Sequence, residues 1–233
     1  MPRTPSQLPL PLAHQPQYGR DSFLAGPSNG AALALIERWP DWPARLVLLS
    51  GPAGSGKTHL AHIWAERSGA AIIHASELDP ESPFAPPSAG LVIDDVAADR
   101  VPDTALFHVI NSAREVGADL LITSRAGSAE WRVRLPDLRS RLRMATPAVL
   151  AAPDDDLLRM VLVKLFADRQ LSIDRAVIDF LLVRMERSIK AAVTLVEALD
   201  REGLATARGI TRPLAARILS ETCGKEGEFT ETE

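Results

Sequence analysis

One segment of the chain limits its possible folds more than any other: residues 51–58, Gly-Pro-Ala-Gly-Ser-Gly-Lys-Thr. This segment matches the pattern G-x-x-x-x-G-K-[ST] at every fixed position, which is the pattern of a phosphate-binding loop. Such loops join a buried strand to a helix, and here an apolar run precedes the segment while a helix-favouring stretch follows it. The alternative, a chance glycine turn, requires the fixed positions and both flanks to agree by accident.

The residue types in this loop are the ones that phosphate binding requires. The glycines let backbone N–H groups curl around a phosphate, and the N-terminus of the following helix adds its positive dipole. The lysine is expected to reach the β- and γ-phosphate oxygens, and the final threonine offers a hydroxyl to Mg²⁺. The residues predicted to bind a nucleotide are Gly51, Pro52, Ala53, Gly54, Ser55, Gly56, Lys57 and Thr58.

Short apolar runs alternate with longer segments over the first two thirds of the chain. The runs lie at residues 45–50, 71–75, 90–94, 119–123 and 145–150. The stretches between them are long enough to hold helices, and this alternation is typical of a parallel sheet with helices on both faces. Ser28 and Asn29 are expected to cap a helix over residues 31–36. The sequence therefore predicts an α/β fold with five parallel strands.

The pattern changes after Pro153. Apolar residues recur at helical spacing over residues 154–222, and three successive aspartates open the first helix, where carboxylates favour the helix dipole. We expect three or four helices there. Five prolines interrupt the first residues, and the last ones are acidic and glycine-interrupted. The predicted parts are an extended arm (1–19), a nucleotide-binding core (20–152), a helical domain (153–223) and an acidic disordered tail (224–233).

Charge and composition narrow the possible partners. The chain has 26 Lys and Arg against 30 Asp and Glu, and the last thirteen residues alone account for the acidic excess. The rest is neutral, which argues against the broad basic face of a DNA-binding protein, and 5% aromatic residues argue against a base-stacking surface. No apolar run approaches the roughly 18 residues of a membrane helix. The single cysteine, Cys223, cannot form an internal disulfide. We expect a cytoplasmic protein without membrane contact.

Two carboxylates, Asp94 and Asp95, follow the apolar run at residues 91–93. Beside a phosphate loop, Asp94 is expected to hold Mg²⁺ and Asp95 to polarise an attacking water. Because the side chain of Asp is shorter than that of Glu, Asp95 places its carboxylate differently from a glutamate at the same position. The alternative is that the pair caps a helix that begins near Ala97.

The apolar run at residues 120–122 ends in two hydroxyl side chains, Thr123 and Ser124. If this strand lies next to the acidic one, a hydroxyl there can orient water near the γ-phosphate. A polar strand end that meets solvent explains the same residues equally well. The order of the strands decides between the two interpretations.

Residues 125–143 contain six arginines against two acidic residues. A guanidinium supplied across a protein interface neutralises charge on a transferring phosphoryl group, which makes one of these arginines a candidate finger. A solvated basic face or a set of internal ion pairs is the ordinary explanation for such a cluster. The residues themselves leave this choice open.

Five segments together resemble the AAA+ module of the bacterial replication initiator DnaA. They are residues 26–29 (GPSN), 51–60 (GPAGSGKTHL), 91–95 (LVIDD), 120–125 (LLITSR) and 136–142 (PDLRSRL). The resemblance covers roughly residues 20–222. It implies an AAA+ P-loop NTPase core with a small all-α lid domain, and ADP or ATP with Mg²⁺ as cofactor. The basic helix-turn-helix with which DnaA reads DNA is not expected here.

Residues 7–12 resemble the hexapeptide that docks in the sliding clamp of DNA polymerase. A proline-stiffened segment loses little entropy on docking, and its leucines can fill apolar pockets. The alternative is a Pro/Leu-rich arm without function. The predicted clamp-binding residues are Gln7, Leu8, Pro9, Leu10, Pro11 and Leu12. With this arm the chain is similar in architecture to the Hda family (Hda and HdaA), the regulatory inactivators of DnaA.

The resemblance to the Hda family implies a function. The clamp would hold the protein, and the protein would stimulate ATP hydrolysis by DnaA, leaving inactive DnaA-ADP. Arg141 matches the family's arginine finger, whereas its neighbours Arg139 and Arg143 do not. The implied partners are the clamp (the polymerase β subunit), DnaA, DNA only through the clamp, and a second copy in a homo-oligomer. Its own ATPase activity is expected to be weak or absent.

One position departs from the family pattern. Lys190 stands where the lid helix usually presents a nucleotide-sensing arginine, and lysine keeps the charge but lacks the planar fork. This substitution puts the preference for ATP over ADP in doubt, and Lys190 is equally well explained as a surface residue. A stand-alone AAA+ ATPase or a helicase loader of the DnaA/DnaC type is the alternative function. It accounts for the phosphate loop and Arg141 but not for residues 7–12.

Overall fold

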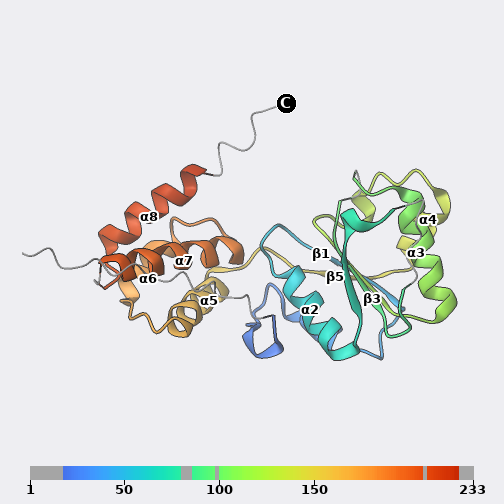
Figure 1. Ribbon diagram of the computed structural model, residues 1–233, viewed down its shortest axis with the longest axis horizontal. Coiled ribbons are helices and arrows are strands. Elements are labelled where there is room, and N and C mark those ends of the chain that lie inside the picture. Colours follow the sequence, from blue (N-terminus) through green and yellow to red (C-terminus); the bar gives the residue numbers. More distant parts are fainter. Residues whose placement is uncertain (1–17, 80–85, 98–99, 207–208, 226–233) are drawn as a thin grey trace, which may run out of the picture. The chain divides into compact units, whose positions relative to one another are not determined.

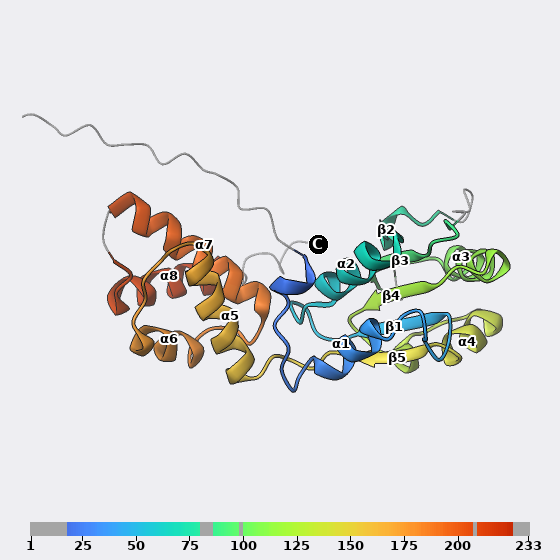
Figure 2. The ribbon, with the colours of Figure 1, turned by 90° about the horizontal axis from the view of Figure 1, so that it is seen from below.

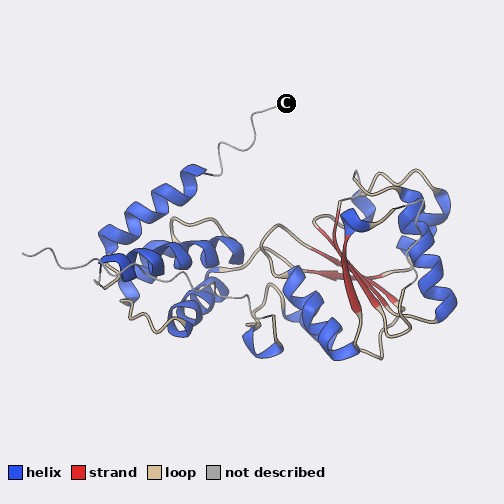
Figure 3. Ribbon diagram, viewed as in Figure 1, coloured by secondary structure: helices blue, strands red, loops and turns tan. Residues whose placement is uncertain are grey.

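The structure is a computed structural model that describes residues 18–79, 86–97, 100–206 and 209–225. It divides into two compact units, and the boundary between them follows Pro153. Figure 3 shows that strands occur in the first unit, whereas the second is helical. Within the described residues, no helix has both the length and the apolar character that crossing a membrane requires.

The first unit is built on five parallel strands. They are β1 (Leu46–Ser50), β2 (Ala71–His74), β3 (Leu91–Val96), β4 (Leu120–Ser124) and β5 (Thr146–Val149). Their order across the sheet is β2-β3-β4-β1-β5, and every neighbouring pair is parallel (Figure 2). The predicted α/β class and five-stranded parallel sheet are confirmed. β1 lies inside the sheet, so the loop that follows it is fixed at its carboxyl edge.

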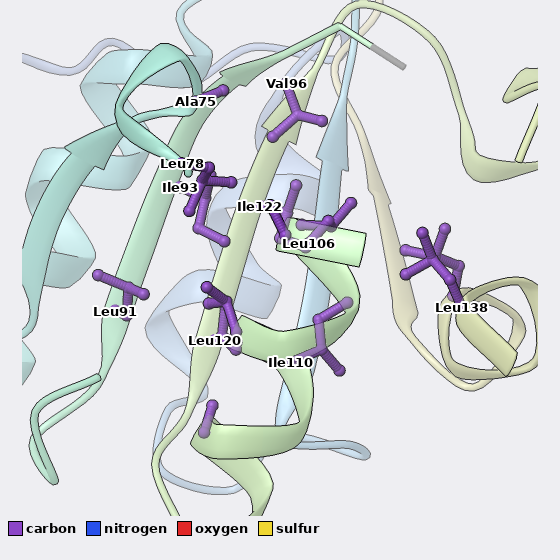
Figure 4. Close-up of a cluster of buried hydrophobic side chains, with 14 of the residues drawn as sticks. Ala75, Leu78, Leu91, Ile93, Val96, Leu106, Ile110, Leu120, Ile122 and Leu138 are labelled. Carbon is purple, nitrogen blue, oxygen red and sulfur yellow. The ribbon is translucent and has the colours of Figure 1, made fainter. Parts of the chain in front are cut away.

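Helices cover both faces of this sheet (Figure 1). Helices α1 (Gly30–Glu37) and α2 (Lys57–Ser68) pack on one face, and α3 (Asp103–Val116) and α4 (Pro136–Arg143) pack on the other. Alternate side chains of a strand point to opposite faces, so β1, β3 and β4 contribute to both cores. Figure 4 shows the core beneath α3, where Leu106 and Ile110 lie against Ile93 and Ile122. The opposite core includes Leu33, Val47, Leu60, Trp64, Val92 and Leu121.

Asn29 occupies the N-cap position of α1, but its side chain accepts no hydrogen bond from the helix. Its Oδ1 instead accepts the N–H of Gly26 at 2.7 Å, and its Nδ2 donates to the carbonyl of Leu24 at 2.9 Å. The side-chain oxygen of Ser28 is buried without a hydrogen-bond partner among the described residues. The predicted capping bonds are therefore wrong, because Asn29 binds the preceding loop rather than the helix.

The second unit contains four helices among its described residues. They are α5 (Asp155–Asp168), α6 (Arg175–Leu182), α7 (Ile189–Thr206) and α8 (Arg212–Lys225). Asp154 caps α5, since its Oδ1 accepts the N–H of Leu157 at 2.8 Å. Leucines at helical spacing form the core, including Leu158, Leu162, Leu181, Leu195 and Leu199. The sequence predicted these helices from the same spacing.

Candidate nucleotide-binding site

The phosphate loop joins β1 to α2 and has a backbone shape that glycine permits. Gly54 and Gly56 have φ values of 69° and 100°, in the left-handed region where a side chain is strained. At Gly51 the constraint is space, because a Cβ would lie 2.5 Å from the carbonyl oxygen of Leu150. The loop is therefore held against the residues that follow β5, and its glycines are required where it bends.

Lys57 is the first residue of α2 and is 8% exposed. Its Nζ donates to the carbonyls of Gly51 and Pro52, both at 2.8 Å. Burial lowers the pKa of this amine; Asp95 and Asp94 oppose the shift, and the nearby Arg125 adds to it. The hydroxyl of Ser55 is buried and has no hydrogen-bond partner within the described residues. A cation and an unpaired hydroxyl inside a glycine loop fit a phosphate group.

Thr58 and Asp94 face each other across α2 and β3. The Thr58 hydroxyl donates to Asp94 Oδ2 at 3.0 Å, and the Thr123 hydroxyl donates to Asp94 Oδ1 at 2.6 Å. A hydroxyl and a carboxylate are oxygen ligands of the kind that Mg²⁺ takes beside a nucleotide. The donor set therefore fits the predicted cation, with Thr123 fixing the direction of the carboxylate.

Asp95 lies at an irregular point of β3. Its φ is 57°, and the register between β3 and β4 shifts between Ile93 and Val96. Its side chain is 45% exposed, and its carboxylate oxygens lie 3.8 Å from Arg125 Nε and 4.0 Å from His74 Nε2. The helix-cap alternative gains no support, because β3 continues to Val96 and the next described helix after it is α3.

The strand order places Thr123 and Ser124 on β4, between β3 and β1. Both side chains are buried, at 0% and 2% exposure, so the interpretation as a solvent-exposed strand end is wrong. The Thr123 hydroxyl accepts the N–H of Asp95 at 2.8 Å, and the Ser124 carbonyl accepts the N–H of Gly51 at 3.2 Å. Thr123 therefore bonds to both acidic residues, and Ser124 bonds to the start of the phosphate loop.

Sequence reasoning did not select His74 or Arg125 as members of this site. His74 ends β2 and Arg125 follows β4, and both lie within 4.0 Å of Asp95. A usable signal existed, because carboxyl ends of neighbouring parallel strands meet at one edge of a sheet. Finding it required the strand order, which the sequence does not show.

Comparison with known proteins adds the family. Residues 155–219 match a family model described as the lid domain of Hda. Domain III of DnaA from Thermotoga maritima has a similar structure, with a TM-score of 0.73 and 19% identity over 89% of this chain and 97% of that one. AMPPCP-bound DnaA from Aquifex aeolicus has a TM-score of 0.68 and 16% identity, over 92% of this chain and 71% of that one. A RuvB structure from Thermotoga maritima has a TM-score of 0.60 and 20% identity, over 82% of this chain and 65% of that one.

The chain is Hda-like in its lid and similar in fold to DnaA and RuvB. Its helical unit is an Hda-type lid, and its sheet unit has the AAA+ fold that DnaA and RuvB share. The predicted fold is therefore confirmed, and the lid match supports the predicted resemblance to Hda.

In this Hda-like chain, Arg141 does not join the nucleotide site. It lies in the last turn of α4, is half-buried, and its side chain makes no hydrogen bond or ion pair with another described residue. Arg139, by contrast, donates to the carbonyl of Val133 at 2.6 Å. Arg143 is exposed.

The remaining predicted site residues lie elsewhere. Lys190 is an exposed residue of α7 in the lid unit of the Hda-like chain. The predicted clamp-binding residues, Gln7 to Leu12, lie outside the described residues.

Proposed function

We propose that this Hda-like protein is a negative regulator of chromosome replication initiation. It stimulates ATP hydrolysis by DnaA through Arg141 while residues 7–12 hold it on the sliding clamp, and the product is inactive DnaA-ADP. The observation that carries the proposal is the placement of Arg141, which has no intramolecular charge partner in the described part of the chain.

The parallel sheet separates Arg141 from the phosphate loop of its own chain. Helix α4 ends just before β5 begins, at the edge of the sheet where strands start (Figure 2). Thr146 pairs beside Val47, and the phosphate loop follows Ser50 at the opposite edge. Three residues of strand span about 10 Å. Arg141 therefore suits a nucleotide held by another protein, and a guanidinium supplied in trans accelerates phosphoryl transfer.

The protein's own site serves as a nucleotide receptor. Residues Gly51 to Thr58 would hold the phosphates of ADP or ATP, and Thr58 with Asp94 would hold Mg²⁺. The lysine donors that now satisfy loop carbonyls would turn to phosphate oxygens. Asp95 lies beside the basic side chains of His74 and Arg125, which attract its carboxylate. Because that carboxylate is then less available to activate water, we expect weak ATP turnover by the protein itself.

Tethering explains how a regulator with a neutral body acts at DNA. The clamp encircles the duplex, so a clamp-bound protein needs no basic face of its own. Residues 7–12 offer leucines at alternate positions on a proline-stiffened backbone, which binds with a small loss of conformational entropy. Tethering also raises the effective concentration of Arg141 near DnaA that is bound to the same DNA.

The test is DnaA-dependent ATP hydrolysis on clamp-loaded DNA with the wild type and two variants. Arg141→Ala is expected to lose about 10³-fold of the stimulation, because an arginine finger contributes about 10³–10⁵ in rate, while clamp binding stays intact. Arg143→Ala, on the same helix, is the matched control and should stimulate normally. Stimulation by Arg141→Ala at the wild-type level would remove the finger assignment. Gln7→Ala/Leu10→Ala should lose clamp binding and stimulation together.

One observation favours a second candidate. The loop, Thr58 and Asp94 form a complete phosphate and cation site, which also fits a stand-alone AAA+ ATPase or a helicase loader. That function predicts ATP turnover by the purified chain without DnaA. Turnover that is unaffected by Gln7→Ala/Leu10→Ala would favour it.

A further inference from the structure

Residues 125–143 contain six arginines, and the structure shows which of them are neutralised within the chain. Arg125 lies 3.8 Å from Asp95, and the other five form no ion pair with any described residue. Among the residues that the structure describes, the interpretation of this cluster as internal ion pairs therefore holds for Arg125 alone. One of the other five, Arg141, is the proposed finger, and three of the remaining four lie close together.

These three arginines meet where the chain enters α4. Trp131 and Val133 are buried, whereas Arg132 and Arg134, which alternate with them, are exposed. This alternation is that of an extended segment, in which residues two apart lie on the same side, about 6.6 Å from each other. Arg139 of α4 donates to the carbonyl of Val133 at 2.6 Å, so its guanidinium lies at the residue between the other two. We call Arg132, Arg134 and Arg139 the arginine strip.

Carboxylates near the strip are bound to backbone amides. Asp103 Oδ2 accepts the N–H of Arg134 at 2.6 Å and that of Leu135 at 3.0 Å. Glu130 likewise accepts a backbone N–H, at 3.2 Å. Asp137 is exposed in the first turn of α4 and forms no ion pair within the described ranges. Guanidinium groups without a counter-charge repel one another, so an anion from outside the chain would stabilise them.

The strip is held in place by the core beneath it. Leu138 and Leu142, which are 1% and 3% exposed, pack α4 on the sheet, and Figure 4 shows Leu138 in this core. The Trp131 indole N–H donates to the carbonyl of Ala126 at 3.1 Å, which fixes the segment that precedes α4. Arg139 is fixed in turn by its bond to Val133. A site that is ordered before binding loses less entropy when a ligand arrives.

Unpaired arginines alone do not make a site. Arg175 and Arg201 of the lid unit are also exposed and form no ion pair with residues that the structure describes. The strip differs from them because three guanidinium groups converge on one fixed segment. We therefore use the two lid arginines as controls below.

The surroundings of the strip favour phosphate over a protein surface. The exposed residues from 132 to 140 are arginine, proline, aspartate and serine, whereas protein interfaces have an apolar core. Arginine and serine are residues that commonly contact phosphate oxygens of DNA. Each strand of a duplex carries one phosphate per about 3.4 Å of helix axis, so arginines about 6.6 Å apart can contact phosphates of the same strand.

We propose that the arginine strip binds the phosphate backbone of duplex DNA, so that the protein contacts DNA directly and without reading its sequence. The near-neutral charge of the whole chain conceals this local excess of positive charge. The contact requires neither DnaA nor the clamp, so it stands or fails independently of the proposed function. On clamp-loaded DNA the same contact would orient the protein along the duplex.

The experiment measures binding of the purified full-length chain to fluorescein-labelled duplex DNA by fluorescence anisotropy, at a series of salt concentrations and without DnaA or the clamp. Each neutralised phosphate adds about 0.9 to the negative slope of log K against log[salt], so three contacts predict a slope of about −2.7. Two duplexes of unrelated sequence should bind with the same affinity, because phosphate contacts carry no sequence information.

Arg132→Gln/Arg134→Gln removes two of the three charges at exposed positions, and melting curves check that the variant is folded. We expect its slope to fall to about −0.9 and its affinity at low salt to fall at least about tenfold. Arg175→Gln/Arg201→Gln is the charge-matched control in the lid unit and should keep the wild-type slope. Arg141→Ala should also keep it, which separates the strip from the finger.

Three outcomes overturn the proposal. The first is the absence of DNA binding at low salt, which would make the strip a solvated basic surface. The second is a double variant with the wild-type slope, which would place the DNA contact elsewhere. The third is displacement of the DNA by polyglutamate of equal charge or by inorganic phosphate at constant ionic strength, which would show an acidic protein segment or a single anion to be the better ligand.

Discussion

Lys57 and Arg141 are both basic residues suited to phosphate, yet their surroundings are opposite. Lys57 is 8% exposed and donates to two carbonyls of its own loop. Arg141 is half-buried on α4 and has no charge partner in the described part of the chain. The first belongs to a receptor for the protein's own nucleotide, and the second is available to another protein. One sheet keeps the two apart because they lie at opposite ends of its strands.

Replacing Arg141 by lysine tests whether its planar fork or only its charge matters. Arg141→Lys keeps the charge but cannot form a bidentate contact, and we expect it to lose about 10³-fold of DnaA stimulation, close to the loss in Arg141→Ala. Arg143→Lys is the control. The rate of ATP hydrolysis by DnaA on clamp-loaded DNA is the measurement. Full stimulation by the lysine variant would mean that charge alone suffices at this position.

Gly51→Ala tests the protein's own nucleotide-binding site. The added Cβ would lie 2.5 Å from the carbonyl oxygen of Leu150, and a backbone atom cannot yield cheaply. We expect a loss of about 3 kcal/mol in the free energy of unfolding, as overpacking of a rigid site costs, together with loss of ADP binding. Gly30→Ala, where nothing lies within 4 Å of the added carbon, is the matched control. Urea denaturation and ADP titration measure both effects, and equal stability of the two variants would contradict the steric argument.

Lys57→Met removes the buried cation with little change in length. We expect ADP affinity to fall about 10- to 100-fold, because a hydrogen bond to a charged group contributes about 1.5–3 kcal/mol. Isothermal titration with ADP measures it. Clamp binding in the absence of ADP should not change, since the predicted clamp contacts are residues 7–12.

The same variant should alter the pH dependence of stability. Burial lowers the pKa of Lys57 below its ordinary 10.5 in the folded state, so the unfolded chain binds more protons between the two values. The free energy of unfolding from this residue therefore rises with pH across that window, and the contribution is constant below the folded-state pKa. Lys57→Met should lose this rise in urea titrations from pH 7 to 10. An unchanged slope would show that the amine titrates normally.

The sequence predicted the elements of this site better than their contacts. The five apolar runs became the five strands. The inner strands β1, β3 and β4 are mostly buried, and a strand buried on both faces needs a continuous apolar stretch. The glycine loop was recognisable because its backbone geometry requires glycine at fixed positions. His74 and Arg125 were not found, since they reach Asp95 only after β2, β3 and β4 are placed side by side.

Two further residues show what local patterns leave undecided. Asn29 has the right type and position for a helix cap, yet tertiary packing gives its amide a better pair of partners in residues 24–26. His59 and His62 lie three residues apart on α2, and in the structure they contact Gly19 and Tyr18 respectively. In both cases a side chain with several possible partners took the one that the fold brought closest.

Thr123 offers the finest test, because it supports the receptor site without belonging to the phosphate loop. Its buried hydroxyl donates to Asp94 and accepts from the N–H of Asp95, so Thr123→Val removes both hydrogen bonds and leaves Asp94 with Thr58 alone. We expect a loss of about 2 kcal/mol in the free energy of unfolding and weaker Mg²⁺ dependence of ADP binding, because Asp94 loses its fixed direction. Thr123→Ser keeps the hydroxyl and should cost only about 0.8 kcal/mol for the missing methyl group. If valine and serine variants bind ADP with the same Mg²⁺ dependence, the hydroxyl does not position Asp94, and the cation site is set by Thr58 and the strand backbone instead.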